Sequence, residues 1–200
     1  MPGGPLAISL GDPAGVGPEL IAAAWARREA EGLLPFCAIG GPDLLTEAAR
    51  RRGLSVPVMP VMSLDEALDC FDRALPALAG ADGDYHPGAP DTSGAELALA
   101  SLEEAARLTV EGEGAALVTG PIAKARLAEV GFVHPGQTEF VAAACGMEPR
   151  DAVMMLAGPS LRTVPLTVHI ALSAVPTALT SDIIVHKTRI VAAALERDFG

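Results

Sequence analysis

The sequence predicts an α/β protein with a parallel or mostly parallel sheet. Short apolar runs alternate with longer segments of helical periodicity along the 200 residues, an order that implies right-handed crossovers. Half of the residues are hydrophobic but only 4% are aromatic, so Ala, Val, Leu and Ile fill the core, as is usual where helices cover buried strands. Ligands of such folds bind at the carboxyl ends of strands, so the strand exits are where a site is expected.

The expected elements follow one another with clear start and stop signals. A buried strand at 6–10 precedes a helix at 17–32, in which Pro18 suits the first turn and Gly32 follows the end. Residues 80–94 form a polar loop, and loops of that length usually carry function or are mobile. The remaining expected helices are 42–53, 63–75 (Ser63 and Glu66 spaced as a capping box), 95–112, 121–131, 140–146 and 181–200. The remaining expected strands are 36–40, 56–61 (at an edge, because of its prolines), 115–120, 152–156 and 162–172.

Charge and cysteine content exclude several classes of partner. Fourteen basic against 25 acidic residues give a formal net charge of −11, which repels nucleic acid and anionic membrane surfaces. Cys37, Cys70 and Cys145 are widely spaced, which favours a reducing cytoplasm and disfavours disulfides or a cysteine zinc site. The first residues lack a secretory signal, and no apolar run reaches the roughly 18 residues of a transmembrane helix.

The first strand exit is "SLGDPAGVGPELI", which carries Asp12. Its glycines and proline make a tight turn into a helix N-terminus that can hold an anion. The stretch is not a Walker A loop, because the Gly-Lys-Ser/Thr ending is missing, and it is not a dinucleotide fingerprint, because Leu20 occupies the place of the third glycine. A ligand-binding role and a purely structural turn both stay open for Asp12.

The second exit is "ALVTGPIAKARL", in which Lys124 lies just inside a helix. Its ammonium group can reach a substrate carboxylate or phosphate as a point charge. The alternative is a solvated helix lysine. The scarcity of lysine supports the first interpretation, because Lys187 is the only other one in the chain.

The third exit is "HPGQTEF", at residues 134–140. Its Pro-Gly pair is turn chemistry, and Gln137 or Thr138 can cap the next helix, with Glu139 placed favourably in the first turn. The functional alternative is that Gln137 and Thr138 point into a cleft and hydrogen-bond a polar substrate.

The fourth exit carries His169, inside "PLTVHIAL". A histidine in such a run is commonly a satisfied core residue, but at a strand end it can bind a metal through its neutral imidazole. One histidine does not make a metal site, and the chain has no HxxxH, HxH or HExxH spacing.

Three strings together resemble one known family. "ISLGDPAGVGPEL", "LVTGPIAKARLAEVGFVHPGQTEFVAAACG" and "MMLAGPSLRTVPLTVHIALSAVPTALT" are similar, in the right order, to the 4-hydroxythreonine-4-phosphate dehydrogenase (PdxA) family of pyridoxine (vitamin B6) biosynthesis. The resemblance implies a fold like that of the isocitrate and isopropylmalate dehydrogenases. In that fold two α/β domains flank a cleft, and the protein is a homodimer. We expect residues 1–125 to belong to the first domain and 126–200 to begin the second.

The resemblance also implies a reaction. The family oxidises the secondary alcohol of 4-phosphooxy-L-threonine with NAD, and decarboxylation then yields 3-amino-2-oxopropyl phosphate. A divalent metal (Zn, Mg or Co) in the cleft binds the alcohol and later the ketone oxygen, and acts as a Lewis acid. NAD accepts the hydride, while the protein positions the reactants and supplies the electrostatic field around them.

Site residues carry over one by one. His169 matches a metal-ligand histidine of the family, whereas Gln137 and Thr138 fall on a His-Thr pair that contacts substrate. Glutamine keeps hydrogen-bonding capacity but is not protonated near neutral pH. The substitution leaves threonate or erythronate 4-phosphate open as substrates. Lys124 is kept, with Ala123 where the family has Asn or His, and Lys124 and Asp12 are candidate substrate contacts. A phosphate acyltransferase of the same fold is the alternative activity.

Family chains are much longer than this one. The part that follows residue 200 in the family carries the other two metal-ligand histidines, the basic contacts to the substrate phosphate and much of the nucleotide site. The sequence is therefore expected to be the N-terminal part of a longer chain, truncated at its C-terminus, without the last strands of the first domain. We expect these 200 residues to be inactive alone. The non-catalytic alternative is that the chain is a fragment that only binds or associates.

Overall fold

The computed structural model describes residues 4–168 and 170–200. The chain divides into two compact units, Met1–His134 and Pro135–Gly200, which are described separately below. The expected division after residue 125 falls inside the last part of the first unit. In the described part of the chain, no helix is long and apolar enough to cross a membrane.

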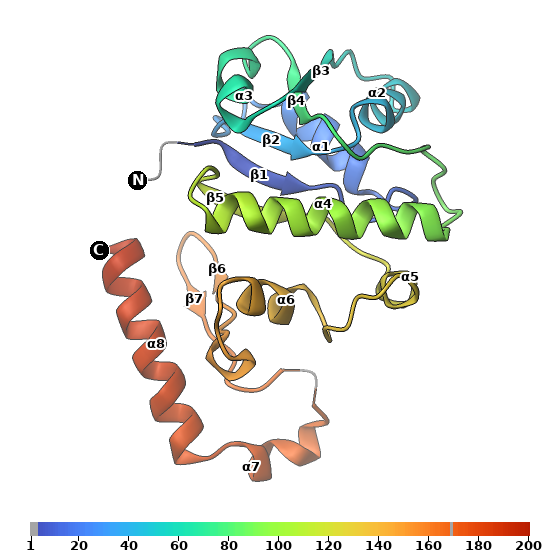
Figure 1. Cartoon of the computed structure of the whole chain (residues 1–200). Helices are drawn as coiled ribbons and strands as arrows, with labels where there is room; N and C mark the ends of the chain where they lie inside the picture. The colour runs from blue at the N-terminus through green and yellow to red at the C-terminus, as the bar shows by residue number, and fades with distance from the viewer. Residues whose placement is uncertain (1–3, 169) are drawn as a thin grey trace. The chain divides into compact units, whose positions relative to one another are not determined.

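The first unit contains a parallel five-stranded sheet with the strand order β3-β4-β2-β1-β5 (Figure 1). This confirms the predicted α/β class with parallel strands. The strands are β1 (Leu6–Ser9), β2 (Phe36–Ile39), β3 (Val58–Val61), β4 (Leu75–Leu78) and β5 (Ala116–Thr119). The helices of this unit are α1 (Gly17–Ala26), α2 (Pro42–Arg51), α3 (Leu64–Cys70), α4 (Thr92–Val110) and α5 (Lys124–Glu129).

Helices cover both faces of this sheet, and each face has its own apolar core. Alternate residues of β2 point to opposite faces, as strand geometry requires, so Ala38 joins one core and Ile39 the other. The first core packs the sheet against α1 and α2, with Trp25 donating its indole N–H to the carbonyl oxygen of Phe71 over 2.9 Å. The second packs the other face against α3 and α4 through residues such as Leu64.

Strand β3 lies at one edge of the sheet, as the prolines of the 56–61 segment predicted. Strand β4 was not predicted, because its first residue, Leu75, was assigned to the end of the 63–75 helix and residues 76–78 to no element. That helix ends at Cys70, after starting with the predicted cap, in which Ser63 accepts from the N–H of Glu66 over 3.3 Å. Pro76 fits inside the sheet because pairing with β2 begins only at Ala77, one residue after the missing N–H.

The second unit contains mostly helices and turns. The expected strand at 162–172 is wrong, because among its described residues only two pair, in a short antiparallel ladder with β6. The expected strand at 152–156 is also reduced, to its last residue. The α-helices are α6 (Gln137–Ala144), α7 (Val175–Ala178) and α8 (Ser181–Phe199), with 3-10 turns η1 (Pro149–Asp151) and η2 (Leu172–Ala174) and strands β6 (Leu156–Ala157) and β7 (Arg162–Thr163).

Candidate functional site

The exits of β1 and β5 lie side by side, as expected for neighbouring parallel strands. The backbone N–H of Asp12 donates to the carbonyl oxygen of Pro121 over 2.8 Å. Gly11 permits this approach, because a Cβ atom there would lie 2.4 Å from that same oxygen and the residue has a φ of +71°. The segments that carry Asp12 and Lys124 therefore meet at the carboxyl ends of β1 and β5.

Asp12 organises its own turn. Its carboxylate accepts the N–H of Ala14 over 2.9 Å, and its carbonyl oxygen accepts the N–H of Gly15 over 2.9 Å. These bonds form a tight turn that leads to α1, with Val16 as the N-cap residue. Two N–H groups of the loop are thus used within the turn itself. The structure gives Asp12 a sufficient structural role.

Lys124 is the first residue of α5, and its side chain is exposed. The helix begins without a side-chain cap, after Ala123 in extended conformation. Lys124 lies shortly after Pro121 in the chain, so Lys124 and Asp12 belong to adjacent strand exits of the first unit. This placement agrees with a contact to an anionic ligand group and equally with a solvated lysine.

Gln137 and Thr138 lie in the second unit, at the start of α6. The expected capping role is wrong, because α6 begins at Gln137 itself, and Gly136 is an N-cap residue without a side-chain hydrogen bond. Glu139 does lie in the first turn, as predicted. Gln137 is half-buried and Thr138 is exposed.

The predicted metal ligand, His169, lies outside the described residues. Among residues 4–168 and 170–200, no three His, Cys, Asp or Glu side chains come together in a way that could hold a metal ion. The described residues therefore supply no donor set through which a metal step can be derived, and metal binding stays a prediction. All three cysteines are free thiols, of which Cys37 and Cys70 are buried.

The 80–94 loop is held to α1 and α2 by contacts that sequence reasoning missed. Tyr85 is buried, and its hydroxyl donates to a carboxylate oxygen of Glu19 in α1 over 2.5 Å. Asp82 accepts the backbone N–H of Asp43 over 2.8 Å and thereby caps α2, whose own N-cap residue is a glycine. The one available signal was Tyr85 itself, a lone aromatic residue in a polar loop.

Comparisons with known proteins agree with this fold. Residues 34–200 match the sequence model of the family described as "Pyridoxal phosphate biosynthetic protein PdxA". The chain is 55% identical, over 98% of its length, to a 4-hydroxythreonine-4-phosphate dehydrogenase of Erythrobacter litoralis, and 46% identical, again over 98%, to the enzyme of that name from Zymomonas mobilis. It spans 58% and 57% of the lengths of these two relatives.

A solved structure supports the architecture. The crystal structure of a 4-hydroxythreonine-4-phosphate dehydrogenase from Klebsiella pneumoniae superposes with a TM-score of 0.83 at 24% identity. The match covers 97% of this chain and 60% of the solved one. At that identity the likeness shows the fold.

Proposed function

Because the chain belongs to the PdxA family of pyridoxal phosphate biosynthetic proteins, we propose that it takes part in the oxidation and decarboxylation of 4-phosphooxy-L-threonine to 3-amino-2-oxopropyl phosphate. The observation that carries this proposal is the 55% identity to a 4-hydroxythreonine-4-phosphate dehydrogenase along nearly the whole chain. The chain spans 58% of that relative, so the activity is proposed for the protein that contains this chain together with the remaining family region. The 200 residues alone are proposed to be inactive.

Each candidate side chain has a role that its chemistry permits. Gln137 can donate and accept hydrogen bonds, and Thr138 can do the same through its hydroxyl, so this pair would hold the polar groups of the substrate. Lys124 would act as a point charge toward a carboxylate or phosphate. Asp12 shapes the β1 exit. It would contact substrate only through the carboxylate lone pairs that do not accept the N–H of Ala14. His169 would be one metal ligand.

NAD and a divalent metal ion (Zn, Mg or Co) are the proposed cofactors. NAD would take up the hydride, and the metal would polarise the oxygen of the alcohol carbon. A homodimer in the cytoplasm is the proposed state of the whole protein. Neither nucleic acid nor a membrane is a proposed partner, since the formal net charge of −11 repels both kinds of anionic surface.

Gln137 favours a second candidate substrate. The family pattern has a histidine there, and an uncharged amide favours a substrate that needs hydrogen bonds and no proton donor at this position. Threonate or erythronate 4-phosphate fits this requirement, because a hydroxyl group replaces the amino group. The reaction class, oxidation of a phosphorylated hydroxy acid, is the same for both candidates.

The test measures NADH formation by the protein encoded by the complete gene, with NAD, a divalent metal and each of the three phosphorylated acids. We expect turnover with one of them, and no turnover with any would refute the proposal.

Thr138→Val removes a hydroxyl at constant shape and should raise KM about tenfold, whereas Thr138→Ser should keep it near the wild-type value. Gln137→His should shift preference toward 4-phosphooxy-L-threonine if the amide sets the choice of substrate.

A further inference from the structure

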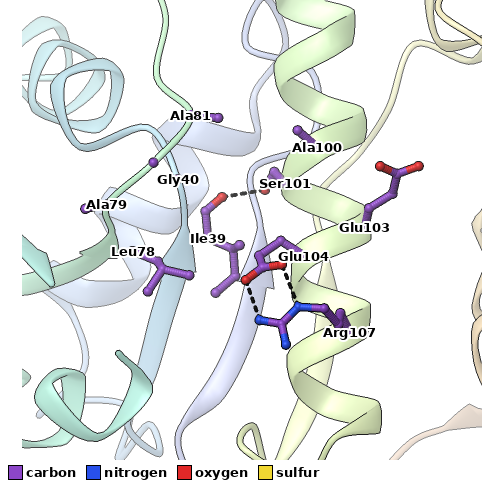
Figure 2. Close-up of a pocket in the computed structure, with 11 residues that line it drawn as sticks. Ile39, Gly40, Leu78, Ala79, Ala81, Ala100, Ser101, Glu103, Glu104 and Arg107 are labelled. Atoms are coloured by element: carbon purple, nitrogen blue, oxygen red, sulfur yellow. Dashed lines mark hydrogen bonds and ion pairs between the residues drawn. The ribbon is translucent and has the colours of Figure 1, made fainter. Parts of the chain in front are cut away.

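A pocket of about 610 Å³ opens in the first unit at the carboxyl ends of β2 and β4, beside α4 (Figure 2). Ligand pockets of small molecules typically measure about 300–1,000 Å³, so the space suits a small organic ligand. None of the candidate substrate residues Asp12, Lys124, Gln137 and Thr138 lines it. The pocket is therefore a separate feature of the first unit.

The chain topology marks this place as a ligand site. After β2 the chain passes to α2 on one face of the sheet, whereas after β4 it passes through the 80–94 loop to α4 on the other face. Since β2 and β4 are neighbours, the connections diverge between them and leave a crevice at their carboxyl ends. Open α/β sheets bind ligands in such crevices.

The residues at the crevice keep it open and apolar on its inner side. Ile39 and Leu78 end the two strands, and Leu78 is only half-buried although it belongs to an inner strand. The small residues Ala79, Gly80 and Ala81 follow β4. Together they provide an apolar surface next to exposed backbone, which suits the apolar body of a ligand.

The charged groups at the pocket come from α4. Figure 2 shows Glu104 and Arg107 projecting from α4 toward Ile39 and Leu78. The Arg107 guanidinium donates to both carboxylate oxygens of Glu104, over 2.8 and 2.7 Å. This contact lowers the pKa of Glu104, so its carboxylate is ionised at neutral pH.

The charged groups around Arg107, at the side of the pocket, carry an excess of negative charge. Arg107 also pairs with Glu111 and, at 3.9 Å, with Glu113, so three carboxylates share one guanidinium. Glu103 also lies at the pocket, but its carboxylate points away from Ile39 and Leu78 in Figure 2. A phosphate or carboxylate would meet repulsion here, whereas a cation would gain from the unshared lone pairs that Glu104 keeps while it is bound to Arg107.

We propose that this pocket binds a small organic cation whose ammonium group contacts Glu104 and whose apolar body lies against Ile39 and Leu78. The ligand class differs from that of the proposed phosphorylated substrate, so the site is an additional one, and the inference does not depend on the proposed function. An ammonium hydrogen-bonded to a carboxylate gives such a site its selectivity, and the apolar contact gives it additional affinity.

The experiment titrates the protein with benzylamine and, as the anion of similar shape, with benzoate. Backbone amide signals of Gly40, Gly80 and Ala81 are followed by NMR. Benzylamine should shift these signals in a saturable manner and benzoate should not. Absence of saturable shifts with benzylamine, or equal shifts with both probes, would overturn the proposal.

Two variants test the assigned contacts. Glu104→Gln should weaken benzylamine binding about tenfold by removing the charge that the ammonium contacts. Ala100→Leu places a larger side chain at the rim of the pocket, from an exposed position of α4. It should abolish binding while the NMR spectrum remains that of a folded protein. The matched control is Glu96→Gln, an exposed glutamate of α4 outside the pocket, which should bind as the wild type does. Equal weakening by Glu96→Gln and Glu104→Gln would also overturn the proposal.

Discussion

The Tyr85 hydroxyl links the 80–94 loop to α1. Burial, and then the hydrogen bond to Glu19, raise the pKa of Tyr85 to about 12 from an ordinary value of 10.0. The protonated phenol is thus favoured in the folded state. Its contribution to stability is complete below pH 10 and is lost as the pH rises from 10 to about 12, because the unfolded chain loses its proton first.

This prediction has a direct optical readout. Tyr85 is the only tyrosine, so the ultraviolet absorbance of tyrosinate follows this one group. The folded protein should titrate close to pH 12, and the protein unfolded in urea close to pH 10. Tyr85→Phe should lower the free energy of unfolding by about 1–2 kcal/mol at neutral pH and remove the loss of stability above pH 10. Identical titration of the folded and unfolded protein would contradict the assignment.

Gly11 is required by both conformation and space. A Cβ atom at this position would lie 2.4 Å from the carbonyl oxygen of Pro121, in a residue with a φ of +71°. Gly53 has a similar φ of +66° but nothing within 4 Å of the same atom. Urea unfolding should therefore show a loss of about 1 kcal/mol for Gly53→Ala and of about 3 kcal/mol or more for Gly11→Ala. Equal losses would show that the contact with Pro121 costs nothing.

Sequence and structure agree for residues whose partners are close in the chain. The turn at Asp12 and the Ser63 cap were predictable, because both depend on residues two or three positions away. The Tyr85 and Asp82 contacts were not, since their partners lie 66 and 39 positions away. Periodicity shows which face of an element is buried and does not show which distant polar group completes a hydrogen bond.

Helix α4 is tied to the sheet by one buried hydroxyl. Ser101 donates to the carbonyl oxygen of Ile39 over 2.6 Å and accepts the N–H of Leu10 over 2.9 Å. It therefore joins α4 to the ends of two neighbouring strands, next to the proposed cation pocket. Ser101→Ala would leave both backbone groups without this buried partner.

The expected cost of Ser101→Ala is about 2–3 kcal/mol of unfolding free energy, measured in urea. Ser93 is the control, since its hydroxyl donates to the exposed carboxylate of Asp91, and Ser93→Ala should change stability by less than about 0.5 kcal/mol. A similar small effect for Ser101→Ala would mean that water replaces the lost hydroxyl at no cost.

Strands were predictable where burial and pairing coincide. The four predicted strands of the parallel sheet are apolar runs with a neighbour on at least one side, whereas β4 was hidden because it begins with Leu-Pro directly after a helix and a short turn. The 162–172 run is just as apolar, yet of the residues that the structure describes in it, only Arg162 and Thr163 pair. Strand formation depends on a partner strand, and a single segment's composition does not contain that information.

The two units differ in how much of their apolar surface is buried. In the described part of the chain, the largest fully buried side chains, Leu10 and Leu127 among them, belong to the first unit. Beyond His134, Ala142 is the one buried hydrophobic residue in the described part of the chain, and Leu161 and Leu172 are exposed. Hydrophobic burial is the main stabilising term, so the second unit should be the less stable one in this chain.

Unfolding of the 200-residue chain should therefore occur in two steps. Trp25 is the only tryptophan and is buried in the first unit, so its fluorescence reports that unit alone. Far-ultraviolet circular dichroism also detects α6 and α8 of the second unit. With increasing urea, helical signal should be lost before Trp25 fluorescence changes, because the second unit has little core to lose. Coincident transitions would instead show that the two units unfold as one cooperative structure.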